Sequence, residues 1–198
     1  MARRNSGEEG GDSGSSGWSI PAWLDWVITI AIGIAVMLVV RAFVAEPFLI
    51  PSGSMLETIQ KDDRVLGEKV SYRFTKPSRG DVVTFRDPER ADTTLIKRVI
   101  ATEGQSVNLV DGDVYVDGER LDEPYVLGKP TEPIVSRYSA LLDAPISYPF
   151  TVPSGCVWVM GDNRTNSLDS RYFGSIPTDS VTSRAVVIFW PPSDFATL

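Results

Sequence analysis

Two patterns of apolar residues divide the chain into regions of different character. From Trp26 to Val40 every residue is apolar, threonine or glycine, and the apolar character continues past Arg41. A helix of about twenty residues spans ~30 Å, the thickness of the hydrocarbon core of a bilayer. The pattern predicts one transmembrane helix at 22–45. The polar residues at 1–21 bury too little apolar surface to fold, so this range is predicted to be a disordered cytoplasmic tail.

A cleaved secretory signal is the alternative interpretation of the apolar run. Such a signal has a shorter apolar core and a cleavage site of small residues, whereas Glu46-Pro47-Phe48 follows here. A retained anchor is therefore favoured. Arg3 and Arg4 precede it and favour a cytoplasmic amino terminus, which would leave most of the chain outside the cytoplasm.

The remaining sequence, 46–198, shows the pattern of β-strands. Short runs rich in valine, isoleucine and aromatic residues alternate with turn residues, which predicts a mainly β catalytic domain. Asp111-Gly112 and Asp117-Gly118 separate successive runs as type I′ turns do, and the lobe at about 106–155 is predicted to be a small second β lobe. The predicted strands are Val65-Leu66, 81–86, 95–101, 106–110, 113–116, 156–160 and 185–190.

Composition excludes several classes of chemistry. The formal net charge of −7 in 198 residues argues against nucleic-acid binding, which needs a basic surface. Cys156 is the one cysteine, so no intrachain disulfide can form, and with no histidine present a zinc site of histidine and cysteine is excluded. The absence of histidine also excludes a Ser-His-Asp triad. A reactive serine would have to pass its proton to a lysine, a carboxylate or a chain terminus.

Ser54 is the candidate nucleophile. It lies in Pro51-Ser52-Gly53-Ser54-Met55, directly after the predicted anchor, and Gly53 permits a sharp turn that a substrate carbonyl can approach. The alternative is an ordinary surface loop, since serine and glycine are common in loops.

Lys97 is the candidate base. Alternation along the run from Leu95 to Ile100 places Leu95, Lys97 and Val99 on one face and Arg98 on the other. A lysine that acts as a base must be neutral, and burial among aliphatic side chains lowers its pKa in the required direction. The alternative is a lysine that protects an edge strand from aggregation.

A third segment, Gly161–Gly174, contains two acids and two arginines within ten residues. This spacing suits bidentate ion pairs that fix a loop. Ser167 lies between them and is the candidate to orient the lysine amine. The four charged residues are Asp162, Arg164, Asp169 and Arg171.

These three segments, together with Arg79-Gly80-Asp81-Val82-Val83, resemble in order and spacing the sequence boxes of bacterial type I signal peptidases. The likeness covers nearly all of the chain beyond residue 20. It implies a signal-peptidase-like β catalytic domain, a membrane-bound serine endopeptidase that removes signal peptides from exported preproteins with a Ser-Lys dyad and no cofactor or metal. It also implies two partners, the signal-peptide-bearing preprotein and the lipid bilayer. The location implied is the cell membrane, single-pass type II, with the catalytic domain on the extracytoplasmic side.

The resemblance also implies roles for individual residues. Ser54 matches the nucleophile, Lys97 the general base and Ser167 the serine that orients the lysine. Ser52, with the backbone N–H of Ser54, matches the oxyanion hole, and the four charged residues of Gly161–Gly174 match an ion-pair group. Six further residues match those that line two small pockets of the family, which accept alanine side chains of the substrate before the cleaved bond. They are Phe48, Ile50, Met55, Ile59, Leu95 and Ile96.

Some positions depart from the pattern of the family. Glu57 stands where proline is usual and Thr165 where aspartate is usual, and an inward-pointing Glu57 would raise the pKa of Lys97. Two other functions stay open. A membrane-tethered β-domain without catalysis, an adaptor or a degenerate homologue, has no physical need for a buried lysine. A self-cleaving repressor would need a DNA-binding module where the apolar run stands.

Overall fold

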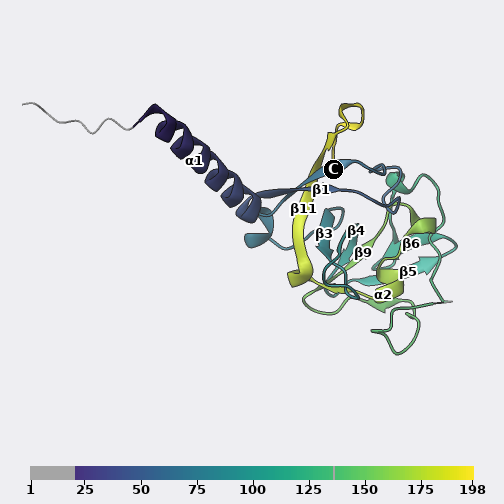
Figure 1. Cartoon of the computed structure of the whole chain (residues 1–198). Coiled ribbons are helices and arrows are strands. Elements are labelled where there is room, and N and C mark those ends of the chain that lie inside the picture. The colour runs from purple at the N-terminus through teal and green to yellow at the C-terminus, as the bar shows by residue number, and fades with distance from the viewer. Residues whose placement is uncertain (1–20, 136) are drawn as a thin grey trace, which may run out of the picture. The chain divides into compact units, whose positions relative to one another are not determined.

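The computed structural model describes residues 21–135 and 137–198, and the tail predicted at 1–21 lies almost wholly outside these ranges. Its first element is the helix α1 (Ala22–Phe43), within which Trp23–Phe43 is long and apolar enough to cross a membrane. The chain divides into two compact units, one ending at Leu38 and one running from Val39 to Leu198. Figure 1 shows helix α1 and the β-rich unit.

The larger sheet of the second unit is antiparallel, with strands in the order β1-β2-β11-β3-β4-β9-β10 and β12 paired to β11. β4 lies inside this sheet, between β3 and β9. The strands are β1 (Ala45–Leu49), β2 (Arg64–Glu68), β3 (Val82–Arg86), β4 (Thr94–Thr102), β9 (Cys156–Met160), β10 (Ile176–Pro177), β11 (Val181–Trp190) and β12 (Ala196–Thr197).

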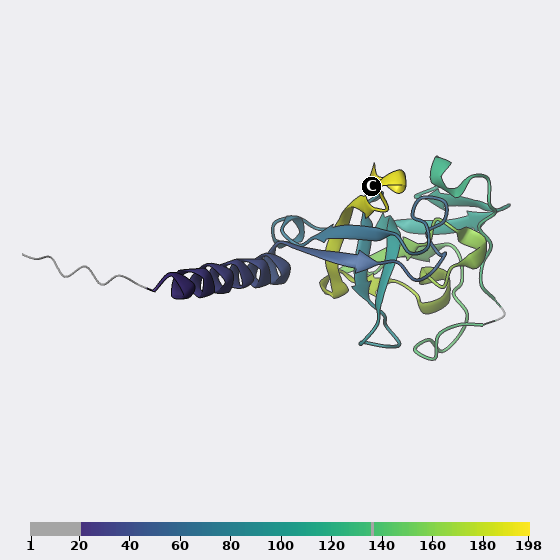
Figure 2. The same cartoon turned by 45° about the horizontal axis from the view of Figure 1, so that its top comes forward.

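A second antiparallel sheet has the order β7-β6-β5-β8 and forms the predicted small β structure. Its strands are β5 (Ser106–Val110), β6 (Asp113–Val116), β7 (Glu119–Arg120) and β8 (Phe150–Thr151). Asp111, Gly112, Asp117 and Gly118 all have φ between 52° and 85°, which confirms the two type I′ turns expected of Asp-Gly pairs. In Figure 1 the β5–β6 hairpin lies to one side of β3, β4 and β9, and Figure 2 turns the same view by 45°.

Apolar side chains of the two sheets fill three core clusters. One lies under β1, β2 and β11, a second joins β4 and β9 to the small sheet, and a third joins β3, β4 and β9 to the helix α2 (Ser170–Phe173). Trp158 is fully buried in the second cluster, where half-buried Cys156 packs as the small hydrophobe that the sequence predicts. These clusters fix β4 and β9 as the centre of the unit.

All seven predicted strands are present. Five strands were not predicted. β1 contains Pro47 and begins at Ala45, inside the range 22–45 predicted for the helix, which in the structure ends at Phe43. The other four, β7, β8, β10 and β12, have two residues each, too few for a recognisable alternation. Between Leu127 and Tyr148 the described residues contain no helix or strand. Short 3₁₀ turns complete the structure at η1 (Ser71–Arg73), η2 (Pro124–Val126), η3 (Arg164–Asn166), η4 (Thr178–Ser180) and η5 (Pro192–Asp194).

Candidate active site

Ser54 lies in the loop after β1, and two hydrogen bonds from Asn163 hold this loop in place. The backbone N–H of Asn163 donates to the carbonyl of Ser54 at 3.0 Å, and its side-chain amide donates to the carbonyl of Gly53 at 2.8 Å. The side chain of Ser54 is buried, with 8% exposure. The loop is therefore an ordered part of the domain, which contradicts the alternative of an ordinary surface loop.

Lys97 lies on β4 and is only 3% exposed. Because β4 pairs with β3 on one side and β9 on the other, the alternative that Lys97 protects an edge strand is wrong. Its Nζ lies 2.7 Å from Oγ of Ser54 and 2.8 Å from the carbonyl oxygen of Ile96. Within 21–135 and 137–198, Lys97 forms no ion pair.

Burial lowers the pKa of Lys97 from 10.5 to about 8, although the charges of Asp169, Asp162 and Asp87 act in the opposite direction. Removing an ammonium from water without a partner disfavours its charged form. About half of the amine is therefore neutral at pH 8. A neutral amine with its lone pair available can accept the proton of the nearby hydroxyl.

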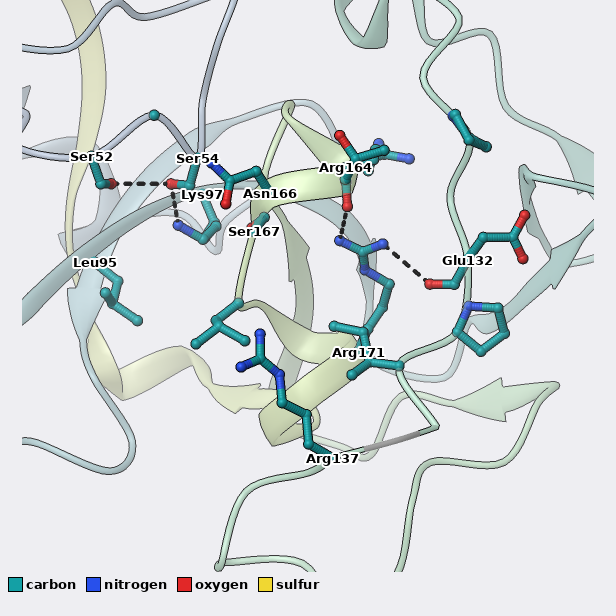
Figure 3. A pocket seen from close by; sticks show the side chains of 16 residues that line it. Ser52, Ser54, Leu95, Lys97, Glu132, Arg137, Arg164, Asn166, Ser167 and Arg171 are labelled. Atoms are coloured by element: carbon teal, nitrogen blue, oxygen red, sulfur yellow. Dashed lines mark hydrogen bonds between the residues drawn. The ribbon is translucent and has the colours of Figure 1, made fainter.

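Ser52 lies beside the pair of Ser54 and Lys97, and its Oγ is 3.5 Å from that of Ser54. Figure 3 shows the two hydroxyl groups and the lysine amine converging at one side of a cavity. The cavity has a volume of about 620 Å³ and is open to solvent. It is large enough to hold several residues of an extended peptide.

Among the six predicted pocket residues, Leu95 lines this cavity. Four others are buried in the first core cluster, and Phe48 packs against that cluster. In the described residues these five do not border the cavity. The four buried residues are Ile50, Met55, Ile59 and Ile96.

Ser167 borders the cavity and is 8% exposed. Its Oγ has no hydrogen-bond partner among the residues that the structure describes, so the structure does not join it directly to Lys97. Gly161 separates Ser167 from the nucleophile loop: a Cβ at position 161 would collide with Oγ of Ser167 and with the backbone carbonyl of Ser54. The close approach of these three segments requires glycine at this position.

The four charged residues of Gly161–Gly174 all form ion pairs, but they do not form one closed group. Arg171 and Asp169 make the one pair within the segment, with Nε to Oδ1 at 2.9 Å and Nη2 to Oδ2 at 3.0 Å. Both side chains are almost fully buried. Burial raises the pKa of the Asp169 carboxyl, but the adjacent Arg171 guanidinium outweighs this effect and holds that pKa below its usual value.

Asp162 and Arg164 pair with residues outside the segment, which corrects the predicted grouping. Arg98 donates to Asp162 from Nε at 2.9 Å and from Nη2 at 2.7 Å, and Arg164 donates to Glu123 at 2.9 Å and 2.6 Å. Asp162 and Arg164 are close along the chain but point to different sides of the turn. The partner of Asp162 therefore comes from β4, and the partner of Arg164 comes from the segment after β7. No local sequence signal identified Glu123, which lies 41 residues from Arg164.

Glu57 points away from the dyad. Its side chain is 55% exposed, and Lys129 lies 4.0 Å from its carboxylate. It is not among the charges that shift the pKa of Lys97. The structure therefore contradicts an inward-pointing Glu57. Thr165 carries no charge, and its hydroxyl donates to the side-chain oxygen of Asn163 at 3.4 Å.

Comparison with known proteins finds similarity to signal peptidases. The family model described as signal peptidase, peptidase S26, matches residues 23–190. A probable signal peptidase I-1 of Synechocystis is 40% identical over 174 residues, which cover 84% of this chain and 82% of that protein. A signal peptidase I of Leptolyngbya laminosa is 36% identical over 178 residues, which cover 85% and 80% of the two chains. A crystal structure of a signal peptidase I from Enterococcus faecalis, at 33% identity, covers 56% of this chain and 97% of its own, with a TM-score of 0.45. The chain belongs to the signal peptidase family, peptidase S26.

Proposed function

We propose that Ser54 and Lys97 form the dyad with which this signal peptidase removes signal peptides from preproteins. The observation that carries the proposal is the 2.7 Å separation of Nζ from Oγ, with the lysine buried and unpaired in the described part of the chain. A nucleophilic serine needs an adjacent base, and a lysine of lowered pKa supplies one without histidine.

In the proposed reaction, Oγ of Ser54 attacks the carbonyl carbon of the scissile peptide bond while Lys97 takes the hydroxyl proton. The lysine then passes this proton to the leaving amine, and the acyl-enzyme forms. A water molecule that gives a proton to the same amine attacks the ester carbon, the bond from that carbon to Oγ of Ser54 breaks, and Lys97 returns the proton to Oγ as the signal peptide leaves with a carboxyl terminus. The negative charge on the tetrahedral oxygen is stabilised by the hydroxyl of Ser52 and the backbone N–H of Ser54.

Ser167 and the ion pairs support this dyad in the proposal. Ser167 orients the lysine amine, and its hydroxyl is buried beside the cavity. Asp162, Arg164, Asp169 and Arg171 act by fixing the backbone around Gly161, not by proton transfer. Their bidentate pairs support this structural role.

In the proposal, the cavity beside Ser54 and Lys97 holds the substrate as an extended peptide. The residues before the scissile bond add as a strand, held by main-chain hydrogen bonds, and small side chains at two positions select the site of cleavage. Leu95 borders the cavity directly, whereas the other five predicted pocket residues lie in or against the first core cluster.

We propose a membrane-anchored arrangement for the reaction: a cytoplasmic tail at 1–21, a single transmembrane helix at 22–45, and a catalytic domain at 46–198 on the extracytoplasmic face of the cell membrane. Helix α1 ends at Phe43, and nine extended residues from Ala45 to Ser54 reach at most about 30 Å. Such a reach suits a substrate that is itself held in the lipid bilayer.

Three variants test the dyad with a synthetic preprotein and the full-length protein in detergent. Ser54→Ala and Lys97→Ala should each lower the rate of cleavage by at least about a thousandfold while the circular dichroism spectrum stays that of a folded β protein. Lys97→Arg retains a cation but cannot release its proton, so it should be as inactive as the alanine variant. Full activity in any of these variants would contradict the proposal.

A further inference from the structure

Glu123 has no role in the chemistry described above, yet it is buried beside the active site. It follows β7 and precedes η2, in the segment that leaves the second sheet. Its two carboxylate oxygens accept hydrogen bonds from Arg164 at 2.9 Å and 2.6 Å, and the side chains of the pair are 7% and 0% exposed. Burying two charges lowers stability unless both are fully paired. We therefore ask what the Glu123–Arg164 pair holds in position.

The same segment is attached to the catalytic segment at further points. Nη1 of Arg164 donates to Oγ1 of Thr131 at 2.7 Å, while within the segment the Tyr125 hydroxyl donates to Glu123 at 2.7 Å. Arg171 donates to the backbone carbonyl of Glu132 at 3.2 Å. Two buried arginines of Gly161–Gly174 therefore hold residues 123–132 in place.

Residues 130–134 form a wall of the cavity, and this wall lies across from the dyad. Pro130, Glu132 and Pro133 line the cavity together with Ser54 and Lys97. Figure 3 shows Glu132 and the two arginines on one side, with Ser52, Ser54 and Lys97 on the other. The position of 123–132 therefore sets the width available to a peptide chain beside Ser54.

Arg164 contacts both the wall segment at 123–132 and the backbone around Gly161. Its Nε donates to the carbonyl of Gly161 at 3.1 Å, and its own carbonyl accepts a hydrogen bond from Arg171 at 2.7 Å. Gly161 packs against Ser54 so closely that no side chain fits there. Without Glu123 the guanidinium of Arg164 would be a buried, unpaired cation, and water in the cavity is the nearest medium that can solvate it.

We propose that Glu123 is a positioning residue for substrate binding: by pairing with Arg164 it keeps that side chain out of the peptide path and holds the wall at 130–134 at its working distance from Ser54. The inference rests on the proposed roles of Ser54 and Lys97. Its effect is on the fit of the bound peptide, whereas the dyad itself does not touch Glu123. Loss of the carboxylate should therefore raise KM more than it lowers kcat.

Loss of this carboxylate should not act on Lys97 through its charge. The charges that act on Lys97 are those of Asp169, Asp162 and Asp87, and of these Asp169 is paired with Arg171 and Asp162 with Arg98. Glu132 and Arg137 also line the cavity. Neither Glu123 nor Arg164 is among the charges that act on Lys97, so loss of the Glu123 carboxylate should leave the pKa of Lys97 unchanged.

The test measures kcat and KM as a function of pH for the full-length protein in detergent micelles, with a synthetic preprotein peptide as substrate. Glu123→Gln should raise KM about tenfold, change kcat by less than about threefold, and leave the pH dependence of kcat unchanged. Glu123→Asp keeps the negative charge at this position, so its KM should stay within about threefold of the KM of the original protein. Thr131→Val removes one hydrogen bond but no charge, so it should raise KM about threefold without moving the pH profile.

The matched control is Asp113→Asn, which breaks the bidentate pair of Asp113 with Arg120 in the same small sheet but on the surface. It should leave kcat, KM and the pH profile unchanged. An unchanged KM in both Glu123→Gln and Thr131→Val would overturn the inference, as would an equal rise in the Asp113→Asn control. Ser54→Ala is measured in the same assay: cleavage by that variant would contradict the dyad, independently of the KM ratios at position 123.

Discussion

Lys97 and Arg98 are consecutive cations on β4, and they have opposite surroundings. Lys97 is 3% exposed and forms no ion pair in the part of the chain that the structure describes. The side chain of Arg98 is 11% exposed, pairs with Asp162 through two hydrogen bonds, and lies 4.1 Å over the ring of Tyr125. Because side chains alternate along a strand, one face of β4 receives an unpaired amine and the other a fully paired guanidinium.

The difference shows how one strand can provide both chemistry and stability. A drop in pKa from 10.5 to about 8 corresponds to roughly 3 kcal/mol by which the folded protein disfavours charged Lys97. This cost makes the amine available as a base. Burial would lower the pKa of Arg98 as well, but hydrogen bonds and charge from Asp162 outweigh it and raise that pKa. Arg98 therefore stays a cation that joins β4 to the Gly161–Gly174 segment.

The largest expected effect on stability comes from removing the partner of Arg98. Asp162→Asn leaves that guanidinium without a counter-charge and should lower the free energy of unfolding by about 3 kcal/mol. The measurement is urea denaturation followed by tryptophan fluorescence. Asp113→Asn, which breaks an exposed pair, serves as the control and should leave the unfolding curve near that of the original protein. Equal unfolding curves for the two variants would show that the buried Arg98–Asp162 pair contributes no more to stability than the exposed Arg120–Asp113 pair, and would contradict this prediction.

Removing the charged group at Lys97 should instead increase the stability of the folded protein. Lys97→Met should raise the free energy of unfolding at pH 7 by about 2 kcal/mol, because the ~3 kcal/mol charge penalty exceeds the ~1 kcal/mol of a lost hydrogen bond. Below pH 8 the lysine is protonated in both the folded and the unfolded protein, so the penalty is complete. Between pH 8 and 10.5 the folded protein releases this proton first, and the penalty disappears. Denaturation at pH 7 and pH 10.5 measures the change, and a Lys97→Met variant that is less stable at pH 7 would contradict it.

The sequence predicted the strand that holds Lys97 and the face on which it lies, because alternation is a local pattern. It predicted the proximity of Ser54 and Lys97 through resemblance, since the two residues are 43 positions apart and the chain between them contains no signal of contact. The Asp-Gly turns were predictable because their residues favour positive φ. These features depend on neighbours along the chain or on a known family.

The partners of Asp162 and Arg164 could not be predicted in this way. A carboxylate and an arginine at close spacing suit a local pair, but tertiary packing brings Arg98 and Glu123 closer to them. The five predicted pocket residues that lie in or against the first core cluster show the same limit. An apolar residue that lines a pocket and one that lies in the layer behind it have the same pattern in the sequence.

The most direct test of the account is the pKa of Lys97 in the folded, full-length protein. Lysines labelled with ¹³C at Cε can be titrated by NMR in detergent micelles, and the signal missing from Lys97→Met identifies the residue. The account predicts a midpoint of about 8 for Lys97, well below the ~10.4 of an ordinary lysine side chain. A midpoint near 10.4 in a protein that still cleaves preproteins would contradict the claim that a buried, neutral amine serves as the base.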